Sequence, residues 1–221
     1  MKQSLKNISS WNANRHLNQM VKDMPPSGIR KFFDLVSEME GAISLGVGEP
    51  DFVTPWHVRE ACIYSLESGN THYTSNKGMP ELREAVCDQI KKEMELDYDP
   101  AEEILITTGV SEAVDLAFRA TLNPGDEVIV PEPCYVAYAP DIILAGGVPK
   151  MVPTRPVDEF RVQPETIASA ITEKTRCLLL SYPNNPTGAI MTRNDLEDLA
   201  DLVVENLKKF CSEREIEFEE I

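Results

Sequence analysis

Two short turns carry groups that could hold a small anionic ligand with a polar ring. In the first, ITTGVSEA, Gly109, Val110 and Ser111 stand where an apolar strand gives way to a helix. The first N–H groups of a helix lack partners and carry partial positive charge, so a phosphate could bind there. Gly109 would let the anion approach the backbone, and Ser111 would add a donor. Many turns of this kind carry glycine and serine without binding an anion, and that alternative stays open.

The second turn, SYPNNPTG, presents the side-chain amide of Asn185. Pro183 and Pro186 fix φ on either side of the asparagines, and a residue before proline is pushed to an extended conformation. The turn follows a strand expected over 175–183, so the amide would lie at the carboxyl end of that strand, where ligands of parallel sheets bind. There it could donate to a ring oxygen without adding charge.

Three further stretches could serve a site or the fold alone. Tyr73, in THYTSNKG, could reach a phosphate or cap its own loop. Tyr135 or Tyr138, in EPCYVAY, could offer a flat face to a planar ligand or pack in the ordinary way. Gly46 and Gly48, in SLGVGEPDF, could expose backbone N–H groups to a carboxylate or only shape the turn.

Alternating strands and helices would position these turns. Hydrophobic periodicity predicts helices over 29–40, 54–69, 79–94, 110–122, 135–147, 163–172 and 193–206. Apolar runs predict strands over 42–52, 103–109, 128–130, 148–153 and 175–183. This alternation predicts an α/β fold with a mostly parallel sheet and helices on its faces.

Local signals add detail to two of the helices. Thr54 is expected to be the N-cap of the helix at 54–69, with Pro55 at its first position. Leu82, Ala85, Val86 and Ile90 are expected to line one stripe of the helix at 79–94.

The composition excludes several classes of function. The chain has 221 residues, 42% hydrophobic and 26% charged, which is typical of a soluble globular protein. Its net charge of -16 argues against nucleic acid and anionic membrane surfaces, and no apolar run approaches the ~20 residues of a membrane helix. Five scattered cysteines without a CxxC pair argue against a metal site and predict free thiols. Without a secretory segment, a cytoplasmic location is expected.

Four stretches, in this order and spacing, resemble the pyridoxal-phosphate-dependent aminotransferases of fold type I, the class I/II family. They are LGVGEPDF, THYTSNKGMPELREAV, TTGVSEAVDLAFRATLNPGDEVIVPEPCYVAY and SYPNNPTG. The resemblance covers about residues 25–206 and is greatest to the bacterial and archaeal branch that handles aromatic or broad substrates. It implies a homodimeric transaminase that uses pyridoxal 5'-phosphate (PLP), an amino acid and a 2-oxo acid. Lyases and synthases share the early motifs, and that alternative stays open.

The resemblance also implies roles for the residues of the two turns. The cofactor phosphate would lie at Gly109, Val110 and Ser111. Tyr135 would stack on the pyridine ring, and Asn185 would donate a hydrogen bond to its 3-oxygen.

Three other residues receive roles from the same resemblance. Tyr73 would reach the phosphate bound by the neighbouring subunit. Gly48 would lie at the substrate carboxylate, and Ile29 would form part of a lid over the substrate.

After residue 206 the chain departs from the family. The family continues into a strand that ends in a D-E-x-Y-like motif and then a Ser-x-x-Lys-like motif, which supplies the Schiff-base lysine. This chain reads LKKFCSEREIEFEEI instead, and Lys150, Lys174 and Lys208 stand in surface-like contexts. We therefore expect no catalytic lysine in these residues and no turnover by this chain alone. The alternatives are a non-catalytic interaction remnant of an aminotransferase and a frameshifted or truncated gene product.

The family resemblance also implies how the chain is organised. A mobile lead-in (1–27) would precede a lid or small-domain segment (28–45), a partial PLP-binding large domain (46–206) and a divergent acidic tail (207–221). The family orders its strands 3-2-4-5-6-7-1. This chain is expected to keep strands 1 to 4, at 104–108, 128–130, 148–152 and 177–181, and to lack the later strands and the C-terminal small domain.

Overall fold

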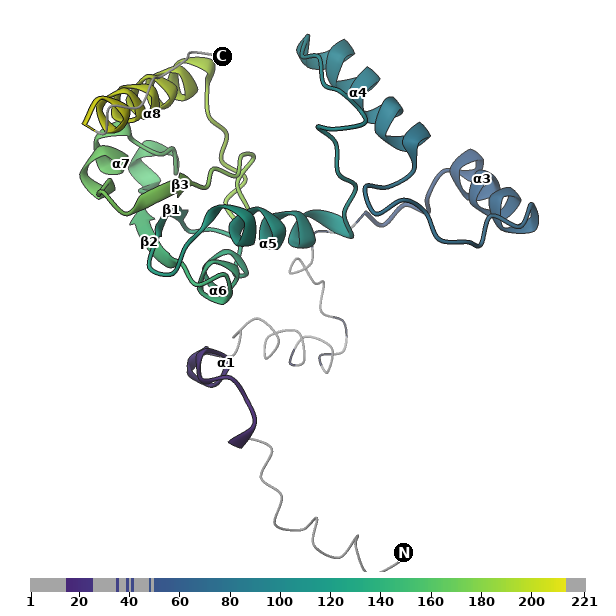
Figure 1. Ribbon diagram of the computed structural model, residues 1–221, viewed down its shortest axis with the longest axis horizontal. Helices are drawn as coiled ribbons and strands as arrows, with labels where there is room; N and C mark the ends of the chain where they lie inside the picture. Colours follow the sequence, from purple (N-terminus) through teal and green to yellow (C-terminus); the bar gives the residue numbers. More distant parts are fainter. Residues whose placement is uncertain are drawn as a thin grey trace, which may run out of the picture. The chain divides into compact units, whose positions relative to one another are not determined.

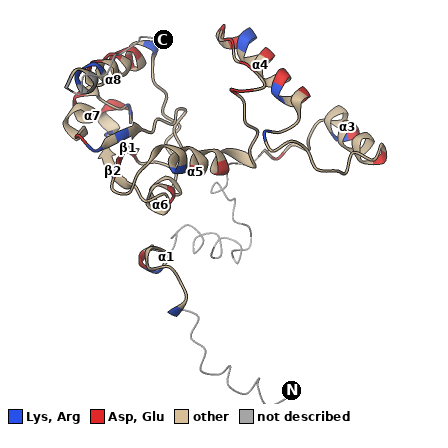
Figure 2. Cartoon of the chain, in the orientation of Figure 1, with Lys and Arg blue, Asp and Glu red and all other residues tan. Residues whose placement is uncertain are grey.

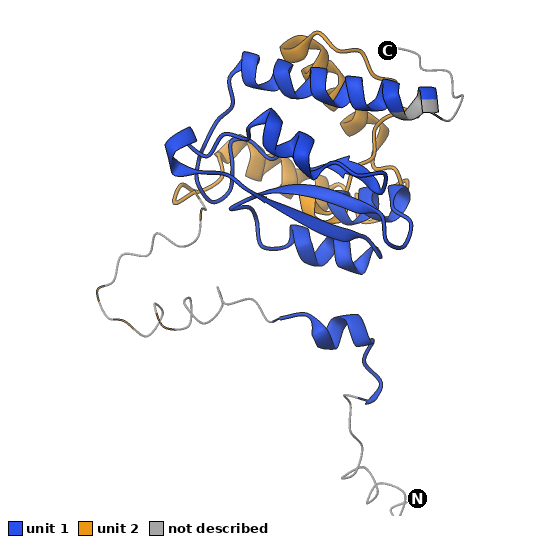
Figure 3. Cartoon of the chain, turned by 90° about the vertical axis from the view of Figure 1, so that its left-hand side faces the viewer, with its two compact units in different colours: residues 1–25, 113–221 blue, residues 26–112 orange. Residues whose placement is uncertain are grey.

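A computed structural model describes residues 15–25, 35, 39, 41, 48 and 50–213 of the chain. These residues divide into two compact units, one of residues 1–25 and 113–221 and the other of residues 26–112 (Figure 3). Most of the helix expected over 29–40 and most of the strand expected over 42–52 lie outside the described residues. Ile29 lies outside them as well.

A three-stranded parallel sheet forms the centre of the first unit (Figure 1). Strand β1 (Glu127–Glu132) lies between β2 (Val148–Pro153) and β3 (Thr175–Leu178). The pairing of β1 with β2 is uninterrupted, and the pairing of β1 with β3 shifts register after the first residue of β1. The order β2-β1-β3 confirms the 3-2-4 part of the strand order that the family resemblance implies.

Helices cover both faces of this sheet (Figure 1). Helices α5 and α6 cover one face, and α7 and α8 cover the other. Their bounds are Gly109–Thr121, Tyr138–Leu144, Pro164–Ala170 and Arg193–Glu213. The first four residues of α5 are assigned to the second unit. The first unit also contains helix α1 (Gln19–Asp23) and the short 3-10 helix η3 (Pro156–Asp158).

The central strand β1 has a core on each of its sides. Val128 is fully buried with Phe118 and Ile142, on the side of α5 and α6. Its neighbour Ile129 is fully buried with Ile167 of α7 on the opposite side. Because successive side chains of a strand alternate between faces, a strand covered on both faces is apolar throughout. This explains the continuous apolar run at 128–130.

Helices α3 (Trp56–Glu67) and α4 (Pro80–Met94) belong to the second unit. The expectation that Thr54 caps α3 is wrong, because the N-cap is Pro55 and no side chain caps the helix.

The buried stripe of α4 differs from the one expected. Arg83 and Cys87 are its buried residues, while Leu82 is 45% exposed. Arg83 Nη1 donates to the carbonyl oxygens of Pro100 and Ala101, which draws this side chain inward. The stripe therefore lies one residue further along the helix than periodicity suggested.

The strand expected over 103–109 does not form in the described part of the chain. Instead of the repeated hydrogen bonds of a strand pair, the segment has isolated backbone hydrogen bonds, such as the one from the Ile106 N–H to the Lys77 carbonyl (3.0 Å). A strand needs a neighbouring strand to pair its backbone groups. In the strand order of the family, this segment is no neighbour of the strands that correspond to β1, β2 and β3.

Helix α8 continues past residue 206 to Glu213. Glu197, Asp201 and Glu205 of this helix are exposed and Leu199 is buried, whereas Leu196 is 46% exposed. Figure 2 shows acidic residues along the helix. No helix among the described residues is long and apolar enough to cross a membrane.

Thr192 and Asp195 form a reciprocal cap at the start of α8. Asp195 Oδ2 accepts from the Thr192 N–H and from Thr192 Oγ1, both at 2.7 Å. The Asp195 N–H donates back to Thr192 Oγ1 (3.2 Å). This capping box satisfies N–H groups that the helix leaves free. The bond from the Thr192 N–H is the main reason that the pKa of Asp195 lies below its ordinary value.

We expect Thr192→Ala to lower the free energy of unfolding by about 1 kcal/mol at pH 7, because the helix loses its cap. Urea unfolding measures the change. Arg193→Ala is the control, since Arg193 is exposed and the change should stay within about 0.5 kcal/mol. The Asp195 carboxylate has a lowered pKa in the folded chain, so its contribution is present above its ordinary pKa of 3.8 and is lost as the pH falls through the folded value. Equal losses from both variants would contradict the cap.

Candidate functional site

The N-terminus of α5 presents an open turn. Gly109 has a φ of +76°, which side chains other than glycine rarely adopt, and no heavy atom lies within 4 Å of where its Cβ would be. Val110 is 73% exposed, and Ser111 is exposed too. Within the described part of the chain, the Ser111 hydroxyl has no hydrogen-bond partner. The turn therefore leaves donors and space for an external acceptor.

Neighbouring residues hold this turn in shape. Thr107 Oγ1 donates to the Gly109 carbonyl (2.9 Å), and the Gly109 N–H donates to the Thr107 carbonyl (2.8 Å). The Glu112 carboxylate accepts the N–H of Thr108. By helix geometry, the N–H groups of the first turn have no acceptor within α5. Their partial positive charge suits a phosphate ester, so these residues fit the phosphate of PLP.

The structure separates the two tyrosines that follow β1. Tyr138 begins α6 and packs against the core that contains Ile142, so its role is ordinary packing. Tyr135 remains 40% exposed and touches Tyr138 edge-on, with ring centroids 5.6 Å apart and an interplanar angle of 77°. An exposed aromatic ring of this kind can stack on a planar ligand.

The turn after β3 gives its two asparagines different tasks. Asn184 Oδ1 accepts from the Thr187 N–H (3.2 Å) and from Thr187 Oγ1 (2.8 Å). The Asn185 side chain is exposed and, among the residues that the structure describes, has no hydrogen-bond partner. The Asn185 amide is thus available to a ligand. The bonds of Asn184 to Thr187 were not foreseen, although an asparagine three residues before a threonine in a turn is the local signal for them.

The expected residues fall into two sets. Tyr135 and Asn185 belong to the first unit, whereas Tyr73 and Gly48 belong to the second, as do residues 109–111. Tyr73 is fully exposed and makes no hydrogen bond within the described residues, so it does not cap its loop. Gly48 is exposed, and Ile29 lies outside the described residues.

Several lysines are engaged in ion pairs away from these turns. Lys150 Nζ pairs with Glu127 (3.2 Å). The Thr172 hydroxyl and then Lys150 hold the pKa of Glu127 below its ordinary value. Lys77 pairs with Glu102 (3.1 Å). The Lys150 pair is partly buried, so the surface-like context expected for Lys150 is wrong, whereas the Lys77 pair is exposed.

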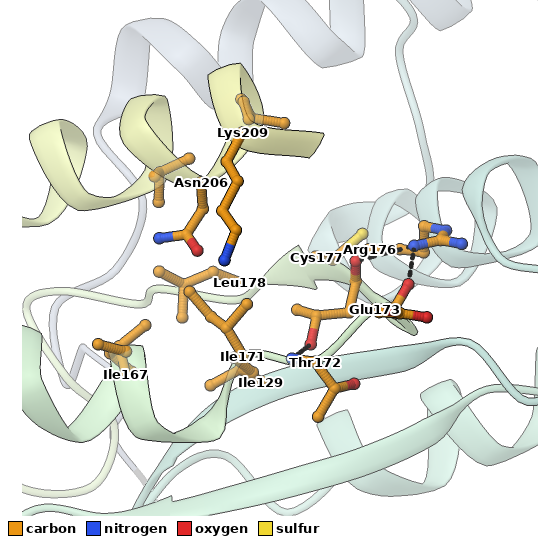
Figure 4. A pocket seen from close by; sticks show the side chains of 14 residues that line it. Ile129, Ile167, Ile171, Thr172, Glu173, Arg176, Cys177, Leu178, Asn206 and Lys209 are labelled. Carbon is orange, nitrogen blue, oxygen red and sulfur yellow. Dashed lines mark hydrogen bonds between the residues drawn. The ribbon is translucent and has the colours of Figure 1, made fainter. Parts of the chain in front are cut away.

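A separate pocket of about 480 Å³ opens beside β3 (Figure 4). Ile129, Ile167 and Leu178 contribute apolar walls, and Asn206 and Lys209 of α8 lie above them. β3 pairs only with β1 in the described residues, so this pocket lies at the free edge of the sheet. None of the residues expected to bind the cofactor lines it.

Comparison with known proteins identifies relatives of this chain. The family described as Aminotransferase class I and II matches residues 40–211. The chain is 44% identical to the aromatic-amino-acid aminotransferase 2 of Thermococcus litoralis, over 91% of this chain and 52% of that protein. It is 45% identical to the aspartate aminotransferase of Pyrococcus abyssi, over 82% of this chain and 46% of that protein. The chain thus spans about half of the length of these curated relatives.

A solved structure agrees with these relatives. The aspartate aminotransferase of Thermus thermophilus, crystallised with maleate, superimposes with a TM-score of 0.80 at 41% identity. The superposition covers 86% of this chain and 50% of that one. The fold of the chain is therefore part of the α/β fold of these enzymes.

Proposed function

The chain belongs to the class I and II aminotransferase family, whose members use pyridoxal phosphate, and we propose that its residues bind the phosphate and ring of that cofactor. The reaction that this binding serves is transfer of an amino group from an amino acid to a 2-oxo acid. Relatives named for aromatic amino acids and for aspartate support donors of these two kinds. When bound, PLP supplies the electron sink for such a reaction. The observation that carries the proposal is the open helix terminus at Gly109, within a motif typical of the family.

The N-terminus of α5 holds the phosphate in this proposal. Gly109 leaves room for the phosphate oxygens, because no side chain fills the space beside it. The N–H groups of Val110 and Ser111 and the Ser111 hydroxyl then donate to those oxygens.

Tyr135 and Asn185 act on the ring in this proposal. The exposed face of Tyr135 stacks on the pyridine ring. The Asn185 amide donates to the ring's 3-oxygen, which needs a donor without a competing partner. Because the amide is uncharged, it orients the ring by a hydrogen bond without adding a charge beside the 3-oxygen.

The remaining roles involve the substrate and a second copy of the chain. We assign the substrate carboxylate to Gly48, part of a lid to Ile29, and the phosphate of a partner in a homodimer to Tyr73. The full exposure of Tyr73 supports its role, because a ring left uncovered by the described residues is available to a neighbour. Free thiols at Cys62, Cys87, Cys134 and Cys177 support a cytoplasmic location.

Chemical turnover needs a lysine that joins the cofactor, and we propose that the lysines of these 221 residues do not supply it. Lys77 and Lys150 lie in ion pairs with Glu102 and Glu127. Lys91 pairs with Asp97, and the hydrogen bond to this carboxylate raises the pKa of Lys91, which favours the protonated, non-nucleophilic amine.

The test is to add PLP to the purified chain and follow three properties together. We expect saturable binding that dialysis reverses, no pyridoxyl group fixed to one specific lysine after borohydride reduction, and no amino-group transfer. Absence of saturable binding would refute the cofactor role. One specifically labelled lysine together with turnover would refute the proposed lack of a catalytic lysine.

The free edge of β3 favours a second candidate, non-catalytic association with a longer aminotransferase chain. An unpaired strand edge beside an apolar pocket can accept a strand from another protein. Co-purification with a full-length aminotransferase would favour this candidate. A chain that stays monomeric in its presence and binds PLP would exclude it.

A further inference from the structure

We propose that Asn184 is the positioning residue that presents the Asn185 amide to the cofactor, an inference that rests on the proposed function of Asn185. The two asparagines are adjacent in sequence and opposite in circumstance. Asn184 is half-buried and bonded on its backbone and side chain, whereas Asn185 is exposed and its side chain is free in the described part of the chain. The first asparagine thus builds the turn from which the second projects.

Asn184 closes the turn through four hydrogen bonds. Its N–H donates to the Ala189 carbonyl (2.8 Å), and its carbonyl accepts the Gly188 N–H (2.8 Å). Its Oδ1 accepts the Thr187 N–H (3.2 Å) and the Thr187 hydroxyl (2.8 Å). The Thr187 oxygen in turn accepts the Ala189 N–H (3.2 Å). Asn185 therefore lies within a turn whose two sides are joined by the hydrogen bonds of Asn184 to Thr187, Gly188 and Ala189.

The orientation of the Asn184 amide is fixed by this arrangement. A backbone N–H can only donate, so the Asn184 atom that faces the Thr187 N–H has to be the oxygen. Asn184 cannot rotate its amide to replace Asn185 as a donor without losing both bonds to Thr187. The hydrogen bonds of the turn thus keep the Asn184 side chain in a structural role and leave the Asn185 amide as the donor.

Both ends of the turn are anchored to the rest of the unit. On one side, the Tyr182 hydroxyl donates to the Phe160 carbonyl (3.1 Å). On the other side, Thr192 and Asp195 cap α8. The segment between these anchors has Asn184 and Thr187 as its internal brace. Loss of this brace should loosen Asn185 while the anchors and the sheet remain.

Thr187 offers a matched pair of variants. Thr187→Val keeps the shape of the side chain and removes the hydroxyl, while Thr187→Ser keeps the hydroxyl. Asn184→Ala removes the acceptor itself. The readout in the cofactor-free chain is the ¹H–¹⁵N heteronuclear NOE of the Asn185 side-chain amide. We expect this NOE to fall in Thr187→Val and Asn184→Ala and to stay at the wild-type value in Thr187→Ser.

Binding of two probes separates the positioning role from the proposed function. The probes are PLP and its 3-deoxy analogue, which lacks the ring oxygen assigned to Asn185. We expect Thr187→Val and Asn184→Ala to weaken PLP binding by about tenfold, to leave the analogue unchanged, and Thr187→Ser to bind like wild type. If Asn185→Ala does not change the preference for PLP over the analogue, the proposed function of Asn185 fails. If Asn185→Ala does change this preference, while Asn184→Ala and Thr187→Val alter neither the NOE of the Asn185 side-chain amide nor the affinity for PLP, the positioning role of Asn184 is overturned.

Discussion

Val128→Asp is expected to abolish the cooperative unfolding transition of the first unit. Val128 is 0% exposed at the centre of β1 and contacts the core formed with Phe118 and Ile142. A carboxylate there would be buried without a partner, at a cost of at least about 4 kcal/mol. That loss is comparable with the whole stability of an ordinary domain, roughly 5–15 kcal/mol. Far-UV circular dichroism during urea unfolding measures the effect.

Val157→Asp is the matched control for this change. Val157 lies in the 3-10 helix η3 and is 80% exposed, so the same substitution places the carboxylate in water. Its unfolding midpoint should stay close to that of the wild type. Similar midpoints for Val128→Asp and Val157→Asp would show that β1 is not the core of the unit.

Ser111→Asp is expected to weaken PLP binding by about 100-fold. The change removes a hydroxyl donor and adds a negative charge where the phosphate would lie, so a lost hydrogen bond and like-charge repulsion act together. A carboxylate in the first turn of a helix is favourable for the helix itself, so α5 should remain folded. The affinity for PLP is measured by isothermal titration, and the fold is checked by circular dichroism.

His57→Asp is the control for the added charge. His57 is exposed in the first turn of α3, away from residues 109–111 in sequence, and has no assigned role at the site. We expect its PLP affinity to match the wild type, and Ser111→Ala to lose about tenfold through the missing donor alone. If Ser111→Asp and His57→Asp bind PLP with equal affinity, the cofactor phosphate does not bind at residues 109–111.

Sequence patterns located the elements of the first unit, although the strand expected over 175–183 ends at Leu178 and the helix expected over 135–147 spans only Tyr138–Leu144. The apolar run at 128–130 requires burial on both faces, and the structure provides cores with Phe118 and with Ile167. Proline at the first position marked the start of α7, and likewise the start of α4 in the second unit.

The failures arose where partners decide the outcome. The segment over 103–109 has the composition of a strand, yet it pairs with no strand in the described residues, because composition cannot supply a neighbour. On α4, two backbone carbonyls draw Arg83 inward, and periodicity cannot detect them.

The candidate site was predictable in its residues and less so in its internal support. The exposed amide of Asn185 and the open turn at Gly109 were expected from proline and glycine positions. The bonds of Asn184 to Thr187 depend on how the turn closes, and several closures were compatible with SYPNNPTG. Only the folded turn shows that these two hydrogen bonds form.

Titration of the ¹⁵N-labelled full chain with PLP, followed by NMR, tests the cofactor role most directly. We predict that the backbone amides of Gly109, Val110 and Ser111 and the side-chain amide of Asn185 shift together and saturate with one dissociation constant. Pyridoxal, which lacks the phosphate, should shift the amides of residues 109–111 far less. Shifts confined to the pocket beside β3, or none that saturate, would contradict a cofactor site built from these residues.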